Sequence, residues 1–182
     1  MNIPNLISLL RIILTPILII CLIQGFYLKA FIVFIVASLT DALDGFLARF
    51  LKQKTVLGSY LDPLADKALI ASSFVTLSIM AALPAWLTVL VISRDLVILT
   101  GICILSQISI QFDVKPALVS KVTTAFQFLT VLVAMASLAS PIHFSSNLMS
   151  VVYWITAILT VVSGFTYIVR GIKILNRDSE SK

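Results

Sequence analysis

The sequence has little charge, since only 12% of its 182 residues are Asp, Glu, Lys or Arg, whereas soluble domains carry about 25%. No polar stretch is long enough to form a soluble domain, so residues 1–182 are expected to form one domain embedded in a membrane. The two cysteines, Cys21 and Cys103, lie in separate apolar segments and are interpreted as small buried side chains.

Two further absences exclude other classes of protein. The sequence has neither a basic run nor an aromatic platform, which excludes nucleic acid as a partner. The first segment has no basic region before its apolar run and no small-residue cleavage site, so we expect a spanning helix there rather than a cleaved signal peptide. The net charge of +5 suits contact with anionic lipid headgroups.

Long apolar runs dominate the rest of the chain. A helix needs about 20 apolar residues to cross the hydrocarbon, and six stretches qualify. We therefore predict an all-α integral membrane protein, a bundle of six transmembrane helices with antiparallel neighbours because every loop is short. The polar tail, residues 176–182, is expected to fray. The six predicted spans cover residues 5–25, 30–50, 58–82, 85–107, 118–139 and 148–172.

Basic residues fix the predicted orientation. With six spans, nearly all basic residues near the helix ends fall on one side, and the opposite side has only Lys29 in the first loop. The positive-inside rule then places both termini in the cytoplasm. The basic residues on the predicted cytoplasmic side are Arg49, Lys52, Lys54, Lys115, Lys121, Arg170, Lys173, Arg177 and Lys182.

Four of the eight acidic residues lie in one stretch, "TDALDGFLARFLKQKTVLGSYLDPLAD". Asp41 and Asp44 are three residues apart, and Asp62 and Asp66 are four apart, so each pair shares one helix face. Both pairs fall in the cytoplasmic halves of antiparallel helices. Each charge in a span costs about 2.5–3.5 kcal/mol on insertion scales, so the four carboxylates need cations or a wet cavity.

Carboxylates at this density are the hard oxygen ligands that Mg²⁺ or Mn²⁺ prefers, and four of them suit two ions about 3.5–4 Å apart. Small residues, Gly45, Ala48 and Gly58, share the faces of the aspartates and would let a bulky group approach the backbone. Packing between helices is the other interpretation of these small residues. Arg49 is expected either to reach a phosphate at the rim or to anchor the helix at the cytoplasmic surface.

The spacing D-x2-D-G-x2-A-R-x8-G-x3-D-x3-D, from Asp41 to Asp66, resembles the signature of the CDP-alcohol phosphotransferase (CDP-alcohol phosphatidyltransferase) family, with no position missing. The opening "NIPNLISLLRIILTP" looks like the first helix of members that make phosphatidylglycerophosphate or cardiolipin. The resemblance thus covers nearly the whole chain.

The resemblance implies a six-helix bundle, a homodimer, and a site open to the cytoplasm, here of a bacterial inner membrane. It implies that Asp41, Asp44 and Asp62 ligate two metal ions, and that Asp66 belongs to the metal shell and is the general base. The reaction it implies transfers a phosphatidyl group from CDP-diacylglycerol to a hydroxyl acceptor and releases CMP. The residues it implies in contact with the CDP group are Asp44, Gly45, Ala48, Arg49 and Gly58.

The acceptor is predicted from basic residues outside the motif. Synthases that use glycerol 3-phosphate usually carry an extra arginine in the fourth helix and a second lysine at the start of the fifth, and the stretches "SRDLVILTGICIL" and "SKVTT" have neither. Phosphatidylglycerol, giving cardiolipin, is therefore favoured, and glycerol 3-phosphate, giving phosphatidylglycerophosphate, is the alternative. The candidate acceptor-binding residues are Arg94, Lys115 and Lys121.

Other interpretations stay open at this point. Carboxylates in a small bundle also suit a cation or proton transporter, although an arginine beside a cation pathway is a poor arrangement. A lipid-binding scaffold without activity gives no reason for four aspartates. Arg94 is either an acceptor contact or a structural partner, Arg11 either a phosphate contact or a snorkelling anchor, and Lys67 is expected to pair with lipid phosphate.

Overall fold

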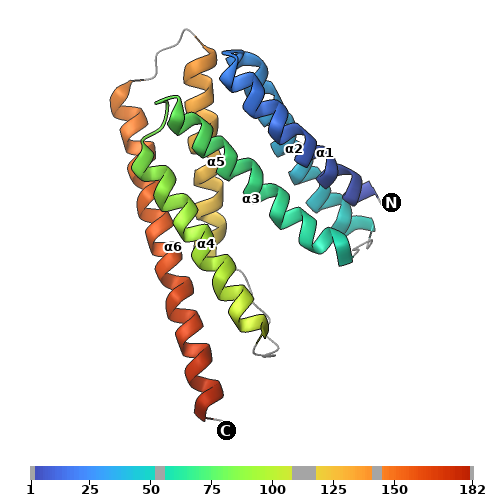
Figure 1. Ribbon diagram of the computed structural model, residues 1–182, viewed down its shortest axis with the longest axis vertical. Coiled ribbons are helices and arrows are strands. Elements are labelled where there is room, and N and C mark those ends of the chain that lie inside the picture. Colours follow the sequence, from blue (N-terminus) through green and yellow to red (C-terminus); the bar gives the residue numbers. More distant parts are fainter. Residues whose placement is uncertain (1–2, 52–55, 108–117, 141–144, 181–182) are drawn as a thin grey trace.

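The computed structural model describes residues 3–51, 56–107, 118–140 and 145–180, with side chains described within residues 9–40, 65–101, 118–140 and 145–172. The described residues form six helices, which confirms the all-α prediction and the six predicted segments (Figure 1). Long apolar runs explain these helices, since a helix satisfies backbone amides within its own segment. The helices are α1 (Ile3–Ile23), α2 (Tyr27–Leu51), α3 (Val56–Ile79), α4 (Ala85–Gln107), α5 (Leu118–Ala139) and α6 (Ser146–Glu180).

The last helix is longer than predicted. We expected it to end near residue 172, where the apolar run ends, but α6 continues to Glu180. The added residues include Arg177, Lys173 and Leu175, which are good helix formers. The predicted end was placed where the apolar run ends. A helix that has already formed continues beyond that point as long as its residues tolerate the conformation.

The helices fall into two groups of three. In the first group α1 packs against both α2 and α3, and in the second α6 packs against both α4 and α5. Contacts of α5 with α2 and α3, and of α3 with α4, join the two groups. Figure 1 shows α1, α2 and α3 together on one side and α4 and α6 on the other.

Two helix ends are closed by the same hydrogen-bond pattern. At the end of α1, the Phe26 amide donates to the Cys21 carbonyl (2.9 Å) and the Gly25 amide to the Leu22 carbonyl (3.0 Å). Gly25 has a φ of 78°, the left-handed conformation that this cap requires. At the end of α3 the corresponding left-handed residue is Ala81, with a φ of 57°.

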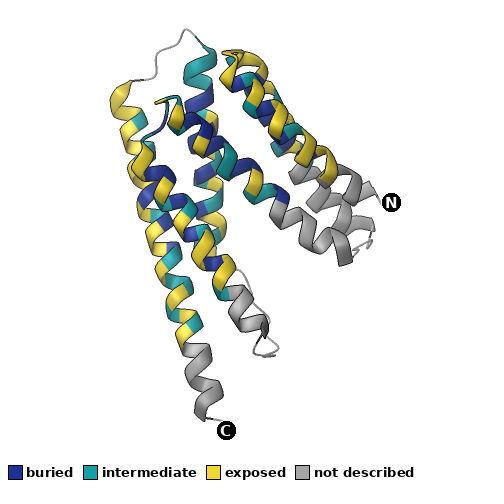
Figure 2. Cartoon of the chain, in the orientation of Figure 1, coloured by how far each residue is buried: buried dark blue, intermediate teal, exposed yellow. Residues whose placement is uncertain are grey.

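The surface away from the helix contacts is apolar. Buried residues lie where the helices face one another, and exposed residues cover the outer faces (Figure 2). Large apolar side chains are among the exposed ones, including Ile20, Ile79, Val89 and Phe165. Within the described part of the chain, two segments are long and apolar enough by themselves to cross a membrane, Leu118–Ala139 and Ser146–Ile172. These features place the protein in or at a membrane.

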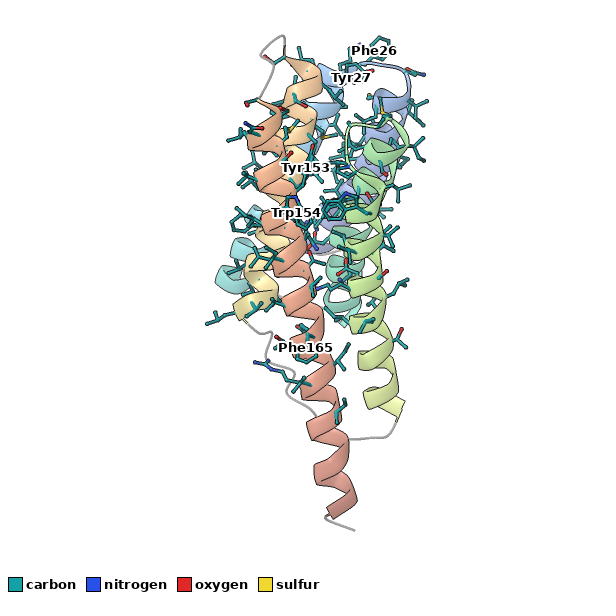
Figure 3. All side chains as sticks on the ribbon, turned by 90° about the vertical axis from the view of Figure 1, so that its left-hand side faces the viewer. Phe26, Tyr27, Tyr153, Trp154 and Phe165 are labelled. Atoms are coloured by element: carbon teal, nitrogen blue, oxygen red, sulfur yellow. The ribbon has the colours of Figure 1, made fainter. Side chains whose placement is uncertain are left out.

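Aromatic side chains join α6 to the end of the bundle that is remote from the aspartates. The Tyr153 hydroxyl of α6 donates to the Ala82 carbonyl (3.1 Å) in the turn between α3 and α4. The neighbouring Trp154 ring lies 5.3 Å, centroid to centroid, from the Trp86 ring of α4. Both α6 residues are labelled in Figure 3. This end is therefore fixed by one hydrogen bond and by aromatic packing.

Candidate functional site

The four aspartates lie near the same end of two successive helices. Asp41 lies ten residues before the end of α2 at Leu51, and Asp66 lies ten residues after the start of α3 at Val56. At about 1.5 Å per residue, these two positions have the same depth, roughly 15 Å from the helix ends. Only residues 52–55 separate α2 from α3, so the two ends lie close together. The helices thus put the four positions at matched depths on α2 and α3, while the side chains of Asp41, Asp44 and Asp62 lie outside the described residues.

Asp66 forms an ion pair with Arg11 across the α1–α3 contact. The Nη1 of Arg11 donates to Oδ1 of Asp66. The Arg11 side chain is fully buried, whereas that of Asp66 is 31% exposed. Snorkelling of Arg11 to the membrane surface is therefore wrong, because its guanidinium finds a carboxylate partner inside the bundle.

A second ion pair involves the next residue of α3. The Lys67 ammonium lies 2.7 Å from Oδ1 of Asp95 on α4, and Nη1 of Arg94 donates to the same oxygen at 2.8 Å. The expected pairing of Lys67 with a lipid phosphate is thus replaced by an internal carboxylate. One oxygen atom of Asp95 therefore accepts from two cations.

Arg94 also joins α4 to the last two helices. Its Nη2 donates to the Ser120 hydroxyl on α5 (2.6 Å) and to the Ser163 hydroxyl on α6 (2.7 Å). Its aliphatic stem lies against α6 at Gly164, where an added Cβ would be 3.5 Å from Cγ of Arg94. These contacts give Arg94 a structural role, which was one of its two predicted roles. Its role as an acceptor contact stays a prediction.

The other predicted residues are placed only in part. Gly45, Ala48 and Arg49 lie in α2 and Gly58 in α3, with their surroundings outside the described part of the chain. Lys121 is exposed on α5, one turn from its start at Leu118. Lys115 lies outside the described residues. The structure thus brings Arg94 and Ser120 together and leaves the acceptor-binding role of the two lysines as a prediction.

The donor set suits a hard divalent cation. Asp66 is the one aspartate of the four whose side chain the structure describes, and its partial exposure leaves the carboxylate accessible from outside the bundle. Arg11 takes one of its two oxygens, and a carboxylate oxygen has lone pairs for more than one partner. Four carboxylates at two matched depths on α2 and α3 therefore fit Mg²⁺ or Mn²⁺.

Sequence reasoning missed two contacts of the site. It assigned no partner to Asp95, and it did not pair Arg11 with Asp66. The signal for both was the cost of an ionisable residue within a span, which demands a partner of opposite charge. The sequence could have shown that partners exist, but the choice of partner depends on which helices touch.

Comparison with known proteins identifies the family. The family model described as CDP-alcohol phosphatidyltransferase matches residues 1–162. The chain is 36% identical to a cardiolipin synthase (CMP-forming) of Rattus norvegicus over 91% of this chain and 60% of that protein, so it spans less than two thirds of that relative's length. It is 32% identical to a CDP-diacylglycerol–glycerol-3-phosphate 3-phosphatidyltransferase of Aquifex aeolicus, over 98% of this chain and all of that protein.

A probable phosphatidylglycerophosphate synthase of Mycobacterium tuberculosis is 32% identical over 94% of this chain and 82% of its own length. Relatives named as cardiolipin synthases and relatives named as phosphatidylglycerophosphate synthases therefore resemble the chain at similar identity. The family model covers the four aspartates, Arg11 and the Lys67–Asp95 pair together. The chain belongs to the CDP-alcohol phosphatidyltransferase family.

Proposed function

We propose that the protein transfers a phosphatidyl group from CDP-diacylglycerol to a glycerol-type hydroxyl and releases CMP. The observation that carries this proposal is the placement of four motif aspartates at matched depths near one end of α2 and α3, with Asp66 held by Arg11. A cluster of acids beside arginines suits an anionic phosphate substrate that brings its own counter-ions. The transporter alternative is not favoured, because the relatives are named as lipid-synthesis transferases.

The reaction requires a base, a leaving group and charge neutralisation. The Asp66 carboxylate accepts the proton of the acceptor hydroxyl, whose oxygen bonds to the lipid-side phosphorus. The bond from that phosphorus to the bridging oxygen breaks, and the electron pair leaves with CMP. Arg49 is proposed to neutralise phosphate charge at the rim. Bound divalent ions, held by Asp41, Asp44, Asp62 and Asp66, would supply further charge neutralisation at the two phosphates.

The membrane arrangement is part of the proposal. All six helices are proposed to span the bilayer, with both termini and the aspartates facing the cytoplasm, because six spans put nearly all basic residues of the sequence near helix ends on that side. A bacterial inner membrane and a homodimer follow from the resemblance to the family. The exposed apolar side chains of the outer faces support contact with lipid chains, for example at Ile20 and Phe165.

Phosphatidylglycerol is the proposed acceptor, and glycerol 3-phosphate is the alternative. Glycerol 3-phosphate is a small dianion whose site needs several converging cations. Two of the cations nearest to the site, Arg94 and Lys67, are already bound to Asp95. A lipid acceptor carries one diester charge and gains affinity from its chains in the bilayer, so it needs fewer cations.

The test is release of CMP by the purified protein with CDP-diacylglycerol and Mg²⁺ or Mn²⁺. Phosphatidylglycerol should be converted to cardiolipin faster than glycerol 3-phosphate is converted to its product. Excess EDTA should abolish the reaction, and restored Mg²⁺ or Mn²⁺ should recover it. Product from glycerol 3-phosphate alone would reassign the acceptor, and full activity in EDTA would contradict the metal site.

A further inference from the structure

Two ion pairs hold α3 from two different sides at the depth of the candidate base. Asp66 and Lys67 are consecutive, so their side chains leave the helix about 100° apart. Asp66 is bound by Arg11 of α1, and Lys67 is bound by Asp95 of α4. Because the two partners lie on different helices, a rotation of α3 about its axis must lengthen at least one of the two pairs.

The Lys67–Asp95 pair is itself fixed by a network that reaches three helices. Asp95 is only 15% exposed, and its Oδ1 is shared by Lys67 and Arg94. Arg94, with 5% of its side chain exposed, is anchored by Ser120 and Ser163. A planar guanidinium with several bound donors loses little freedom when it holds a carboxylate, so Asp95 is set in one place. Lys67 is thus tied through one carboxylate to α4, α5 and α6.

The network lies where the two helix groups meet. Asp66 belongs to the first group, and its neighbour Lys67 contacts the second. Arg94 and Ser163 belong wholly to the second group. Among the described side chains of α3, Lys67 is the cation that carries this connection. The position of the candidate base relative to the second group therefore depends on a charge pair and not only on apolar packing.

We propose that Asp95 is a positioning residue, which holds the Asp66 carboxylate at its working depth and angle through Lys67. This inference rests on the proposed function, because it assigns a role toward the same reaction. Asp95 does not touch the reacting groups in this scheme. Its effect passes through α3, and a misplacement of about 1 Å at a reacting group can cost about 10²-fold in rate.

The test is a double-mutant cycle in the full-length protein with Lys67→Met and Asp95→Asn. Each single change should lower kcat by up to about 10²-fold, and the double variant should be no slower than the worse single variant, since both changes break one connection. KM for the acceptor should stay within about twofold of the wild type. Lys67→Arg keeps a cation at the pair and should retain most of the rate.

Two readouts separate positioning from simple support of the fold. Affinity for Mn²⁺ alone, measured by electron paramagnetic resonance without substrate, should fall in both single variants, because Asp66 is a candidate ligand. Thermal unfolding of Lys67→Met, at the more exposed partner, should change little in detergent. Lys29→Met is the matched control, since it removes one exposed lysine at the opposite end of the bundle, whose Nζ lies 4.5 Å from the Phe26 ring centroid.

Several results would overturn the proposal. Losses that multiply in the double variant would show that the two residues act separately. A lower unfolding temperature with unchanged kcat and Mn²⁺ affinity would show a purely structural pair, and a change confined to acceptor KM would make Lys67 a substrate contact. If the wild type transfers no phosphatidyl group, the proposed function fails. The double-mutant cycle can then be measured on Mn²⁺ affinity, which still tests whether Asp95 positions Asp66.

If Asp95→Asn does not fold, Lys67→Met, at the more exposed partner, tests the same role by itself.

Discussion

The two helix groups bury different chemistry. In α1–α3 the buried side chains are mostly apolar, with Leu18, Phe34 and Phe74 at its centre. In α5 and α6 buried polar residues outnumber buried apolar ones among the described side chains. The buried polar residues there are Thr123, Gln127, Thr130, Thr156, Thr160 and Ser163, and the buried apolar ones are Val131, Ala134, Met135 and Ala157.

The polar residues of the second group satisfy one another. The Thr130 and Thr156 hydroxyls lie 2.7 Å apart, and the Thr123 hydroxyl donates to the Leu159 carbonyl across the α5–α6 contact at 3.0 Å. Thr130 and Thr160 also donate to carbonyls of their own helices, which removes the cost of burying the hydroxyls. Hydroxyl contacts of this kind hold helices together where lipid tails leave no hydrophobic driving force.

Buried polar residues in this bundle are therefore of two kinds, neutral hydroxyls and ionised groups. Neutral hydroxyls on α5 and α6 find partners within a turn or on the adjoining helix, and they serve packing. Ionised groups on α1–α4 need partners of opposite charge, and Arg11, Asp66, Lys67 and Asp95 form such pairs. The chemistry of the protein is therefore expected where these ion pairs lie, and substitutions there should have different consequences from substitutions at the buried hydroxyls of α5 and α6.

The largest loss of transfer rate should come from Asp66→Asn. This change removes the candidate base without changing its size, so the transfer rate should fall by roughly 10²–10⁴-fold while CDP-diacylglycerol binding persists. Asp44→Asn should instead weaken metal and CDP-diacylglycerol binding together. Turnover and equilibrium binding of both variants, in detergent or liposomes, give the measurement.

The control for this loss of rate is a substitution of a buried hydroxyl on α5. Thr130→Val removes a buried hydroxyl and should leave the transfer rate within about twofold, because hydroxyl contacts of this kind contribute only about 0.6 kcal/mol. Near-normal turnover in Asp66→Asn would assign the base elsewhere.

A smaller effect is expected where a glycine makes room for the nucleotide. Gly58→Leu should weaken CDP-diacylglycerol binding by about 1–3 kcal/mol through crowding, while the protein still inserts and folds. Gly101→Leu on α4 is the matched control, because nothing lies within 4 Å of a Cβ added at Gly101. Direct binding of the CDP-lipid is the measurement. Equal binding in the two variants would leave helix packing as the role of Gly58.

The helix caps allow a comparison of stability in which the two changes should have opposite signs. Gly25→Ala puts a side chain at a left-handed position and should cost about 1 kcal/mol, although nothing crowds the added Cβ. Ala81→Gly relieves the corresponding strain at the end of α3 and should stabilise by up to about 1 kcal/mol. Thermal unfolding checks both, and a shift of the same sign in the two variants would contradict the shared cap geometry.

The smallest effect is expected within the hydroxyl contacts of the second group. A double-mutant cycle with Thr130→Val and Thr156→Val should give a coupling of about 0.6 kcal/mol in unfolding free energy. The rate of CMP release should be unchanged in both single variants. A coupling near zero would mean that each hydroxyl is satisfied by its own helix alone.

The helices and the positions of the four aspartates along them follow from the sequence alone. Apolar runs of spanning length define α1 to α6, because backbone amides in an apolar surrounding must bond within their own segment. The spacing of Asp41, Asp44, Asp62 and Asp66 sets their helix faces and their matched depths, since both follow from residues per turn and rise per residue. Local geometry of this kind needs no knowledge of the neighbouring helices.

Which charged residues pair with one another depends on how the helices pack. Arg11 lies 55 residues from Asp66 in sequence, and Ser163 lies 69 from Arg94, so no local pattern relates them. Hydropathy treats every outward face of an apolar helix alike, and the helix order around the bundle does not follow from it. The Arg11–Asp66 and Lys67–Asp95 pairs exist because α1 and α4 both contact α3. Partner choice therefore came from helix packing, which selects one among the few cations and carboxylates able to satisfy each buried charge.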